Sequence, residues 1–377
     1  MTRFGFLSTY PPTRCGLATF TSSLATAISD GGDDVCDIVR VDDLVPAGPS
    51  INTATVRVVG DLRPRDAAGR ELAADLLNDR DVVVIQHEYG IYGGPDGEEI
   101  LDLLARIRAP KIVVMHTVLP SPTPHQRSLT TAIGEQADAV VAMTRTAMTL
   151  LVDLYDVAPD KVHLIPHGVR WAPAVVQSVH TRPTILTWGL LGPGKGIEWG
   201  IRAMALLTDL DPAPLYRVLG QTHPKVVIDQ GEQYRSSLGM LVGGLGLKGD
   251  VQIDGRYRET AELAAEVAAA DIVLLPYDSR DQATSGVLVE AVAAGKLVIA
   301  TRFPHSIELL SQGGGILVDH QNPDQIAQAI RAALADPARA RQAQTAARES
   351  ARANSWGAVA QSYKAVAAEL SRVSVSW

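Results

Sequence analysis

Short runs of β-branched residues alternate with alanine- and leucine-rich segments along most of this 377-residue chain. Runs such as Val82–Gln86 (VVVIQ) and Lys111–Met115 (KIVVM) are apolar at four successive positions, without the apolar–polar alternation of a strand with one solvent face. Strands buried on both faces are typical of parallel sheets that helices cover on each side. The alternation therefore predicts an α/β protein whose sheets are doubly wound.

The pattern of strands and helices runs through the chain twice. The predicted strands of the first series are Arg3–Leu7, Val35–Val39, Val56–Val59, Val82–Gln86, Lys111–Met115, Ala139–Met143 and Val162–Ile165, and its helices include Ala18–Ser29, Glu71–Asn78, Glu98–Arg108 and Arg145–Tyr155. The strands of the second series are Thr184–Thr187, Tyr216–Leu219, Val251–Ile253, Asp271–Leu275, Leu297–Ala300 and Gly315–Val318, and its helices are Glu198–Leu207, Thr260–Ala269, Val287–Ala294 and Pro323–Ala335. Because the chain also exceeds the size of one ordinary core, we expect two domains.

Residues 168–183 separate the two series and follow neither periodicity, and they include Pro173 and Pro183. We expect an N-terminal domain at 1–170, a linker at 171–183 and a C-terminal domain at 184–354. A last helix, Ser355–Leu370, follows within the segment 355–377, and a stripe of apolar residues runs along it. The chain thus divides into two α/β domains and a terminal helix.

Charge and cysteine content narrow the classes of partner and compartment. The chain carries 34 basic and 42 acidic residues, a net charge of −8, and no run of Lys or Arg that indicates nucleic-acid binding. Cys15 and Cys36 form neither a disulfide framework nor a metal-ligand spacing, which fits a reducing cytosol. The N-terminus lacks a signal peptide's apolar region, and no apolar run reaches membrane-spanning length. We expect a soluble, cytoplasmic protein without a membrane span or a nucleic-acid partner; its oligomeric state stays open.

The segment Asp281–Thr301 (DQATSGVLVEAVAAGKLVIAT) predicts a polar loop, a helix and a strand in succession. Free N–H groups at the start of such a helix, at the positive end of its dipole, suit an anion or sugar hydroxyls. Glu290 is the only charge in the apolar stretch Val287–Ala294, where a buried carboxylate is costly without a partner. The pattern fits a ligand-binding helix start, and it fits a capped core helix with Glu290 as an ordinary acid equally well.

A glycine-containing turn follows the first strand of each series. Gly16 comes before a helix, where a glycine either allows backbone to approach a ligand or serves only a tight turn. Lys195 follows three glycines and a proline in GLLGPGKG, where it can neutralise a phosphate or stay solvated. The first turn lacks the GxGxxG fingerprint of nicotinamide-binding domains, and Gly196 stands where a P-loop requires Ser or Thr.

Polar side chains also follow two strands of the first series. His116 comes directly after KIVVM, and His87, Glu88 and Tyr89 come after VVVIQ, at strand ends where α/β proteins gather ligand-binding groups. A lone histidine is nevertheless more often structural. The spacing matches no HExxH metal motif, and no GxSxG or Cys–His signature indicates a covalent hydrolase. We therefore expect no metal site.

Taken in order, these motifs resemble those of the retaining family 4 glycosyltransferases with the GT-B fold, over nearly the whole chain. The matching features are Gly16, His116, VHLIPHGV, GLLGPGKG, VLLPY and the helix that carries Glu290. The resemblance implies two Rossmann-like, doubly wound domains that face each other across a cleft, with the last helix crossing back to the first domain. It also implies transfer of a hexosyl unit from a nucleotide-diphosphate sugar to a carbohydrate or small hydroxylated acceptor, with no metal or other cofactor.

The resemblance further implies roles for individual residues. Lys195 would hold the donor diphosphate, Glu290 the ribose hydroxyls, and His116 the transferred sugar. The catalytic residues would be His116, Lys195 and Gln282. The donor-binding residues, on the C-terminal domain apart from the early glycine, would be Gly16, Lys195, Arg256, Tyr257, Asp281, Gln282, Ser285, Gly286, Val287, Leu288 and Glu290. The acceptor-binding residues, on the N-terminal domain, would be Tyr10, Arg14, His87, Glu88 and Tyr89.

Two positions depart from the family pattern. Gln282, beside Asp281, stands where the family has the first of two glutamates, and Leu190 stands where the family has a phosphate-binding arginine. A neutral amide can bond sugar hydroxyls, but it supplies no charge. These departures leave two alternatives: a phosphorylase that acts on an α-glycoside with inorganic phosphate, and a non-catalytic GT-B-shaped protein that binds a sugar or a nucleotide.

Overall fold

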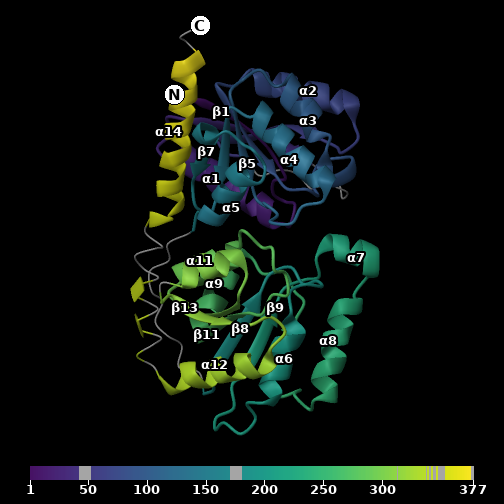
Figure 1. The fold of residues 1–377 in the computed structure, drawn as a ribbon, viewed down its shortest axis with the longest axis vertical. Coiled ribbons are helices and arrows are strands. Elements are labelled where there is room, and N and C mark those ends of the chain that lie inside the picture. Colours follow the sequence, from purple (N-terminus) through teal and green to yellow (C-terminus); the bar gives the residue numbers. More distant parts are fainter. Residues whose placement is uncertain are drawn as a thin grey trace. The chain divides into compact units, whose positions relative to one another are not determined.

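The structure is a computed structural model that describes residues 1–41, 52–169, 181–311, 313–336 and 353–374, with a few isolated residues between 338 and 346. The chain forms two compact units. The first unit is Met1–Gly168 together with Asn354–Trp377, and the second is Val169–Ala353. Most of the predicted linker 171–183 lies outside the described residues, which resume at Thr181. Each unit is built on one sheet (Figure 1).

The first unit has a seven-stranded sheet in which all neighbouring strands are parallel. In spatial order its strands are β3 (Val56–Leu62), β2 (Val35–Val41), β1 (Arg3–Ser8), β4 (Val82–His87), β5 (Lys111–Met115), β6 (Ala139–Ala142) and β7 (Val162–Leu164). The order runs outward from β1 in both directions. The chain therefore changes direction across the sheet between β1 and β4, which makes this point the switch point of the sheet.

Helices pack on both faces of this sheet. They are α1 (Gly16–Ser29), α2 (Ala67–Asn78), α3 (Ile100–Arg106), α4 (Pro124–Gln136), α5 (Arg145–Asp153) and α14 (Trp356–Ser374), with short 3₁₀ turns η1 (Pro95–Gly97) and η2 (Pro159–Lys161). Successive residues of a strand point to opposite faces. Accordingly, Phe4 and Phe6 share a core with residues of α1 and α14, whereas Gly5 lies against Leu77 of α2.

The last helix, α14, belongs to the first unit. It runs beside α1 (Figure 1), and Val359, Tyr363 and Val366 are buried in the same core as Phe20. An ion pair between Lys364 Nζ and Asp34 Oδ2, 2.8 Å apart, also joins α14 to the segment before β2. The predicted return of the terminal helix to the first domain is confirmed.

The second unit repeats the architecture with a six-stranded parallel sheet. In spatial order its strands are β10 (Val251–Asp254), β9 (Leu215–Leu219), β8 (Thr184–Trp188), β11 (Ile272–Leu275), β12 (Leu297–Thr301) and β13 (Gly315–Val318). Its helices are α6 (Ile197–Ala205), α7 (Pro224–Gln230), α8 (Gln233–Gly244), α9 (Thr260–Ala269), α10 (Gly286–Ala293), α11 (Pro304–Leu310) and α12 (Pro323–Ala335). Here the switch point lies between β8 and β11.

The predicted pair of Rossmann-like, doubly wound units is confirmed, but three helices of the second unit were not predicted. Helices α7 and α11 are seven residues each and begin with proline, so they show too few turns for a periodic pattern. Helix α8 contains three glycines and buries only Leu238 and Val242, so its apolar stripe is weak. Across the described ranges, no helix is long and apolar enough to cross a membrane.

Candidate functional site

The predicted site residues lie after the carboxyl ends of strands in both units. In the first unit they follow β1, β4 and β5, apart from His87, which is the last residue of β4, and in the second they follow β8, β10 and β11. Both sets therefore include the loops on the two sides of a switch point, where the crevice of a doubly wound sheet takes its ligands. We describe each unit by itself.

His116 follows β5 and lies against the end of β4. Its backbone N–H donates to the carbonyl of His87 (3.1 Å), and its Nε2 is 2.6 Å from Oε1 of Gln86. Its ring meets Phe20 of α1 edge-on, with centroids 4.8 Å apart. Desolvation, and then the neighbouring His167 and His87, lowers the pKa of His116 to about 3. The imidazole is therefore neutral near pH 7, so it offers hydrogen-bonding capacity and no charge.

Two more neutral histidines stand at the same edge of the sheet. His87 is 0% exposed, neither of its ring nitrogens has a hydrogen-bond partner within the described residues, and burial lowers its pKa to about 4. Burial also lowers the pKa of His167 to about 4. The ring of Phe20 contacts His116, His167 and Trp356, so α1 and α14 help to build this edge.

Glu88 and Tyr89, just after β4, are tied to neighbouring loops. The Oε2 atom of Glu88 accepts a 2.6 Å hydrogen bond from Oγ1 of Thr117, and its Oε1 accepts one from the backbone N–H of Tyr89 (3.0 Å). The hydroxyl of Tyr89 lies 2.8 Å from Oγ1 of Thr130. The bond to Thr117, the residue after His116, joins the loop after β4 to the loop after β5.

The loop after β1 leads into α1 at Gly16. Cys15 caps the helix, because its Sγ accepts from the N–H of Ala18 (3.4 Å). Gly16 is exposed, its φ lies outside the left-handed region, and a Cβ there would meet no atom within 4 Å. The fold therefore does not require glycine, so the tight-turn interpretation is wrong and an approach of backbone to a ligand remains. Of the other predicted residues of this loop, Arg14 is exposed, whereas Tyr10 is 5% exposed and lies in the core.

In the second unit, Lys195 lies at the switch point between β8 and β11. Its Nζ is 4.4 Å from the centroid of the Tyr277 ring. Lys195 is half-buried, and no ion pair joins it to a carboxylate in the part of the chain that the structure describes. The ammonium therefore contacts an aromatic face and forms no ion pair with a carboxylate of the described residues.

The start of α10 lies in the loop region after β11. The side chain of Ser285 caps the helix by accepting from the N–H of Leu288 (3.3 Å), and the N–H of Ser285 donates to Nδ1 of His305 (2.8 Å). Two of the predicted donor groups are therefore used inside the protein. The N–H groups of Gly286 and Val287 make no hydrogen bond to any described residue, which leaves them at the positive end of the helix.

Glu290 differs from its prediction. The side chain is exposed on the outer side of α10, while Leu288, Val289 and Ala291 are buried. The cost of burying its carboxylate therefore does not arise, and that part of the sequence argument was wrong. Gln282 is half-buried, and its Nε2 donates to the carbonyl of Thr284 (3.2 Å). The adjacent Asp281 is exposed.

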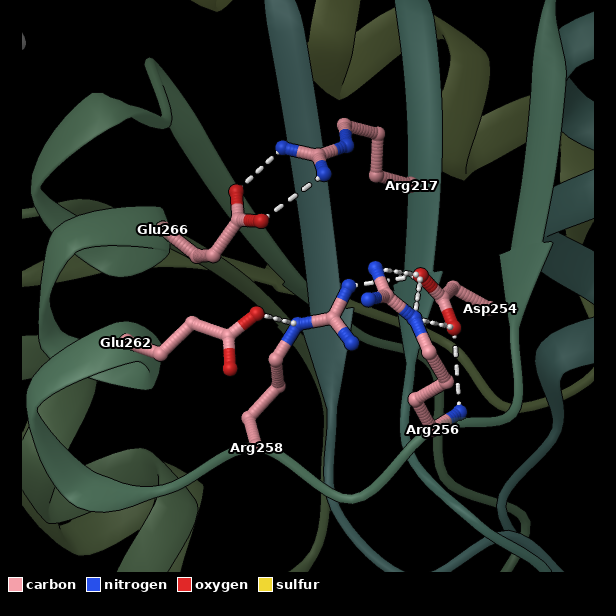
Figure 2. Close-up of polar contacts among 6 residues, drawn as sticks. All are labelled: Arg217, Asp254, Arg256, Arg258, Glu262 and Glu266. Carbon is pink, nitrogen blue, oxygen red and sulfur yellow. Dashed lines mark hydrogen bonds and ion pairs between the residues drawn. The ribbon is translucent and has the colours of Figure 1, made fainter.

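Arg256 and Tyr257 lie in the loop after β10, beside a network of charged side chains. Figure 2 shows Arg256 turned back onto Asp254, which accepts hydrogen bonds from both its backbone N–H (3.0 Å) and its guanidinium Nη2 (2.9 Å). The same carboxylate accepts from Nη2 of the buried Arg258 (2.6 Å), which also pairs with Glu262 of α9. The arginines hold the pKa of Asp254 well below its usual range. This network shapes the loop and leaves Tyr257 37% exposed.

The structure adds residues that sequence reasoning did not assign. They are Gln86, Phe20, His167 and Trp356 in the first unit, and Trp199, Tyr277, Asp278 and His305 in the second. His167 and Tyr277 lie inside VHLIPHGV and VLLPY, two of the motifs that carry the family resemblance. Within the described ranges, no three His, Cys, Asp or Glu side chains gather as a metal site requires.

Two protein-family models match consecutive parts of the chain. A model described as Glycosyltransferase Family 4 matches residues 15–171, and one described as Glycosyl transferases group 1 matches residues 172–350. Together they cover residues 15–350, which include most of both units.

Curated relatives have related names. D-inositol 3-phosphate glycosyltransferase 1 of Catenulispora acidiphila is 31% identical over 339 residues, which is 81% of this chain and 75% of that protein. D-inositol 3-phosphate glycosyltransferase of Corynebacterium glutamicum is 31% identical over 248 residues, covering 60% of this chain and 56% of its own length.

Solved structures share the fold at low identity. Sucrose-phosphate synthase from Thermosynechococcus elongatus matches 98% of this chain and 99% of its own with a TM-score of 0.78 and 19% identity. Anabaena Alr3699/HepE in complex with UDP-glucose covers 100% of both chains with a TM-score of 0.72 and 14% identity. The two matching models, the relative from Catenulispora and the two parallel-sheet units agree, and the chain belongs to glycosyltransferase family 4, with the GT-B fold.

Proposed function

We propose that this protein is a retaining glycosyltransferase that moves a hexosyl unit from a nucleotide-diphosphate sugar to a hydroxyl acceptor without a metal ion. The observation that carries the proposal is Lys195, a cation without a carboxylate partner among the described residues, held at a switch point. A preorganised positive charge of this kind stabilises the negative charge that develops on a leaving diphosphate. The N–H groups of Gly286 and Val287 add two donors at the positive end of α10.

The reaction of this type runs on one face of the sugar, where the diphosphate leaves on the side from which the acceptor hydroxyl arrives. Its main demand is charge stabilisation at the leaving group. In this proposal Lys195 meets that demand, and neutral His116 binds a hydroxyl of the transferred sugar. Gln282 also bonds the sugar, but its amide adds no charge. The electrostatic contribution therefore rests mainly on one lysine.

The names of similar proteins suggest the first substrates to test. A solved structure of Anabaena Alr3699/HepE contains UDP and glucose, which supports a UDP-hexose as a donor. The curated relatives named above are D-inositol 3-phosphate glycosyltransferases, which supports a cyclitol phosphate as an acceptor. We assign the donor to the second unit, with Arg256 and Tyr257 flanking the base and Glu290 at the ribose. The acceptor is assigned to the first unit, beside His87, Glu88 and Tyr89.

A substrate panel tests the proposal directly. The purified chain would be incubated with UDP-, GDP- and ADP-glucose or -mannose and with inositol, inositol 3-phosphate and simple sugars, with and without EDTA. We expect release of one nucleoside diphosphate and no effect of EDTA on the rate. NMR of the product should show the same anomeric configuration at the transferred sugar as in the donor. An inverted product or loss of activity in EDTA would contradict the mechanism, and no release from any donor would contradict the function.

Gln282 and Leu190 favour a second candidate, a phosphorylase that cleaves an α-glycoside with inorganic phosphate. The lysine turn carries one cation. A single phosphate carries less negative charge than a diphosphate, so one cation compensates it more fully. Incubation with α-linked disaccharides and phosphate distinguishes the two, since only a phosphorylase forms a sugar 1-phosphate. Absence of both reactions, together with tight nucleotide binding, would identify a non-catalytic binding protein.

A further inference from the structure

The aromatic ring that the Lys195 ammonium contacts is buried in the core of the second unit. Tyr277 is 1% exposed, and its ring stacks on Phe303 with centroids 5.3 Å apart and planes 25° apart. Its carbonyl accepts hydrogen bonds from Oγ1 of Thr301 (2.7 Å) and lies 2.7 Å from Nδ1 of His320. The ring of Tyr277 thus packs on Phe303, and its backbone is bonded to residues at the end of β12 and after β13.

The lysine turn is pressed against the same segment. The carbonyl of Gly194 accepts from the N–H of Asp278 (2.9 Å), and a Cβ on Gly196 would lie 1.9 Å from the carbonyl oxygen of Pro276. Gly196 also has a φ of +60°, which favours glycine. Both flanks of Lys195 are thus fixed to the residues on either side of Tyr277, so the lysine stem starts directly beside the ring.

The hydroxyl of Tyr277 does not explain this arrangement. Its oxygen is buried and has no hydrogen-bond partner among the described residues, which is unfavourable for a polar atom. The π face, in contrast, attracts the ammonium at 4.4 Å, because an aromatic ring carries negative potential on its face. A carboxylate in the same place would also hold the lysine, but it would cancel the charge that a phosphate needs.

We propose that Tyr277 is a positioning residue whose ring holds the Lys195 ammonium, charged and oriented, for the diphosphate of the donor. This inference rests on the proposed function. A lysine has a flexible four-carbon stem and loses rotamer freedom when it binds a ligand. If its side chain is already ordered before the ligand binds, the entropy lost on binding is smaller. The device compensates for Leu190, which leaves this turn with one cation where the family pattern has two.

The test measures binding of UDP, GDP, ADP and inorganic pyrophosphate by calorimetry in the full chain. A cation–π contact of roughly 0.5–2 kcal/mol corresponds to about two- to thirty-fold in Kd. Tyr277→Phe keeps the ring and should bind within about two-fold of the wild type, whereas Tyr277→Leu should bind about two- to thirty-fold more weakly. In a Lys195→Met background, Tyr277→Leu should have no further effect.

Tyr277 is a core residue, so Tyr277→Leu can also disturb the packing around it. A second series of variants therefore keeps the size and shape of the aromatic ring. Phenylalanine at position 277 would be replaced by its mono-, di- and trifluorinated forms, which withdraw negative potential from the ring face at nearly constant size. We expect Kd to rise with each fluorine at an unchanged Tm. The matched control is the same fluorinated series in the Lys195→Met background, where Kd should not change with fluorination.

The outcomes separate the inference from the function. Equal losses for Tyr277→Leu with and without Lys195, or a fluorination series with flat Kd, would overturn the positioning role. Pyrophosphate binding that depends on both residues, without any sugar transfer, would support the inference and contradict the proposed function. If Lys195→Met binds every probe as tightly as the wild type, both are wrong.

Discussion

The two units have the same architecture but differ in the charge of the side chains at their carboxyl edges. The first unit places three histidines there, and burial keeps them neutral. The second places Lys195 on an aromatic ring beside the start of α10, so its edge offers positive charge. Hydroxyl groups need hydrogen-bonding partners, whereas a diphosphate needs charge. Under the proposed function, one fold that is used twice in a chain divides these two kinds of recognition between its copies.

Removal of the charge in the second unit should have the largest effect. With Lys195→Met, kcat/KM for the donor should fall about 10²- to 10³-fold, the loss typical of deleting one preorganised electrostatic contact. The Tm should change little, because Lys195 makes no ion pair with any described residue. The matched control is Lys248→Met, at an exposed lysine of the same unit. A variant at 195 that keeps near-wild-type turnover would remove the basis for the comparison.

Glu290→Gln should have the next largest effect, because Glu290 is the residue of this unit that we propose to bind the ribose. We expect nucleoside-diphosphate binding to weaken by roughly 1–3 kcal/mol, the range for a hydrogen bond to a charged group. Calorimetry with ribo- and 2′-deoxyribonucleotides separates the ribose contact from other causes. If the substitution weakens both nucleotides equally, Glu290 does not bind the 2′-hydroxyl; unchanged binding of the ribonucleotide would exclude any ribose role.

The neutral histidines of the first unit predict a pH dependence of stability. The pKa of His87 is about 4 in the folded protein and about 6.5 in an unfolded chain. Between these values the unfolded state binds the proton and the folded state does not, so the free energy of unfolding decreases as pH falls. The slope from this residue is about 1.4 kcal/mol per pH unit, and the stability is complete only above about pH 6.5.

Urea unfolding at pH 7, 6 and 5 measures this slope. His87→Leu should remove about one proton from the pH dependence while it keeps an apolar side chain in the core. If the wild type and the variant lose stability in parallel on acidification, His87 is not buried neutral as the structure places it.

Gly16→Ala should have the smallest effect on stability. A Cβ at this position meets no atom within 4 Å, so the free energy of unfolding should stay within about 0.5 kcal/mol of the wild type. Donor affinity should nevertheless decrease if backbone approaches a ligand there. Gly168→Ala is the contrast, because its Cβ would lie 2.2 Å from Trp356, and overpacking of this kind costs about 1–3 kcal/mol. Unchanged donor affinity in Gly16→Ala would leave Gly16 without a role at the site.

Periodicity predicted the fold because both sheets depend on local patterns. The runs KIVVM and DIVLL each contain four successive apolar residues. A parallel strand that is buried on both faces needs no other sequence feature. Helix α8 was missed because tertiary packing, through Leu238 and Val242, stabilises a segment whose own pattern is weak.

The candidate site was predictable as a set of strand ends, but its contacts were not. Lys195 and Tyr277 come together because β8 and β11 are neighbours in the sheet, and no spacing in the sequence expresses that neighbourhood. The exposure of Glu290 depends on which side of α10 faces the core. Similarly, Gln86 was hidden inside an apolar run, although it lies 2.6 Å from His116.

The position of α14 affects the order in which the chain can fold during its synthesis. The first unit is discontinuous in sequence, since Met1–Gly168 needs Asn354–Trp377 to complete it. Ribosomes make the whole second unit before α14 emerges, so Phe20 and its neighbours lack Val359 and Tyr363 during that interval. The first unit therefore cannot complete its core until the last segment has been translated. A premature stop codon near the C-terminus would destabilise the unit that was synthesised first.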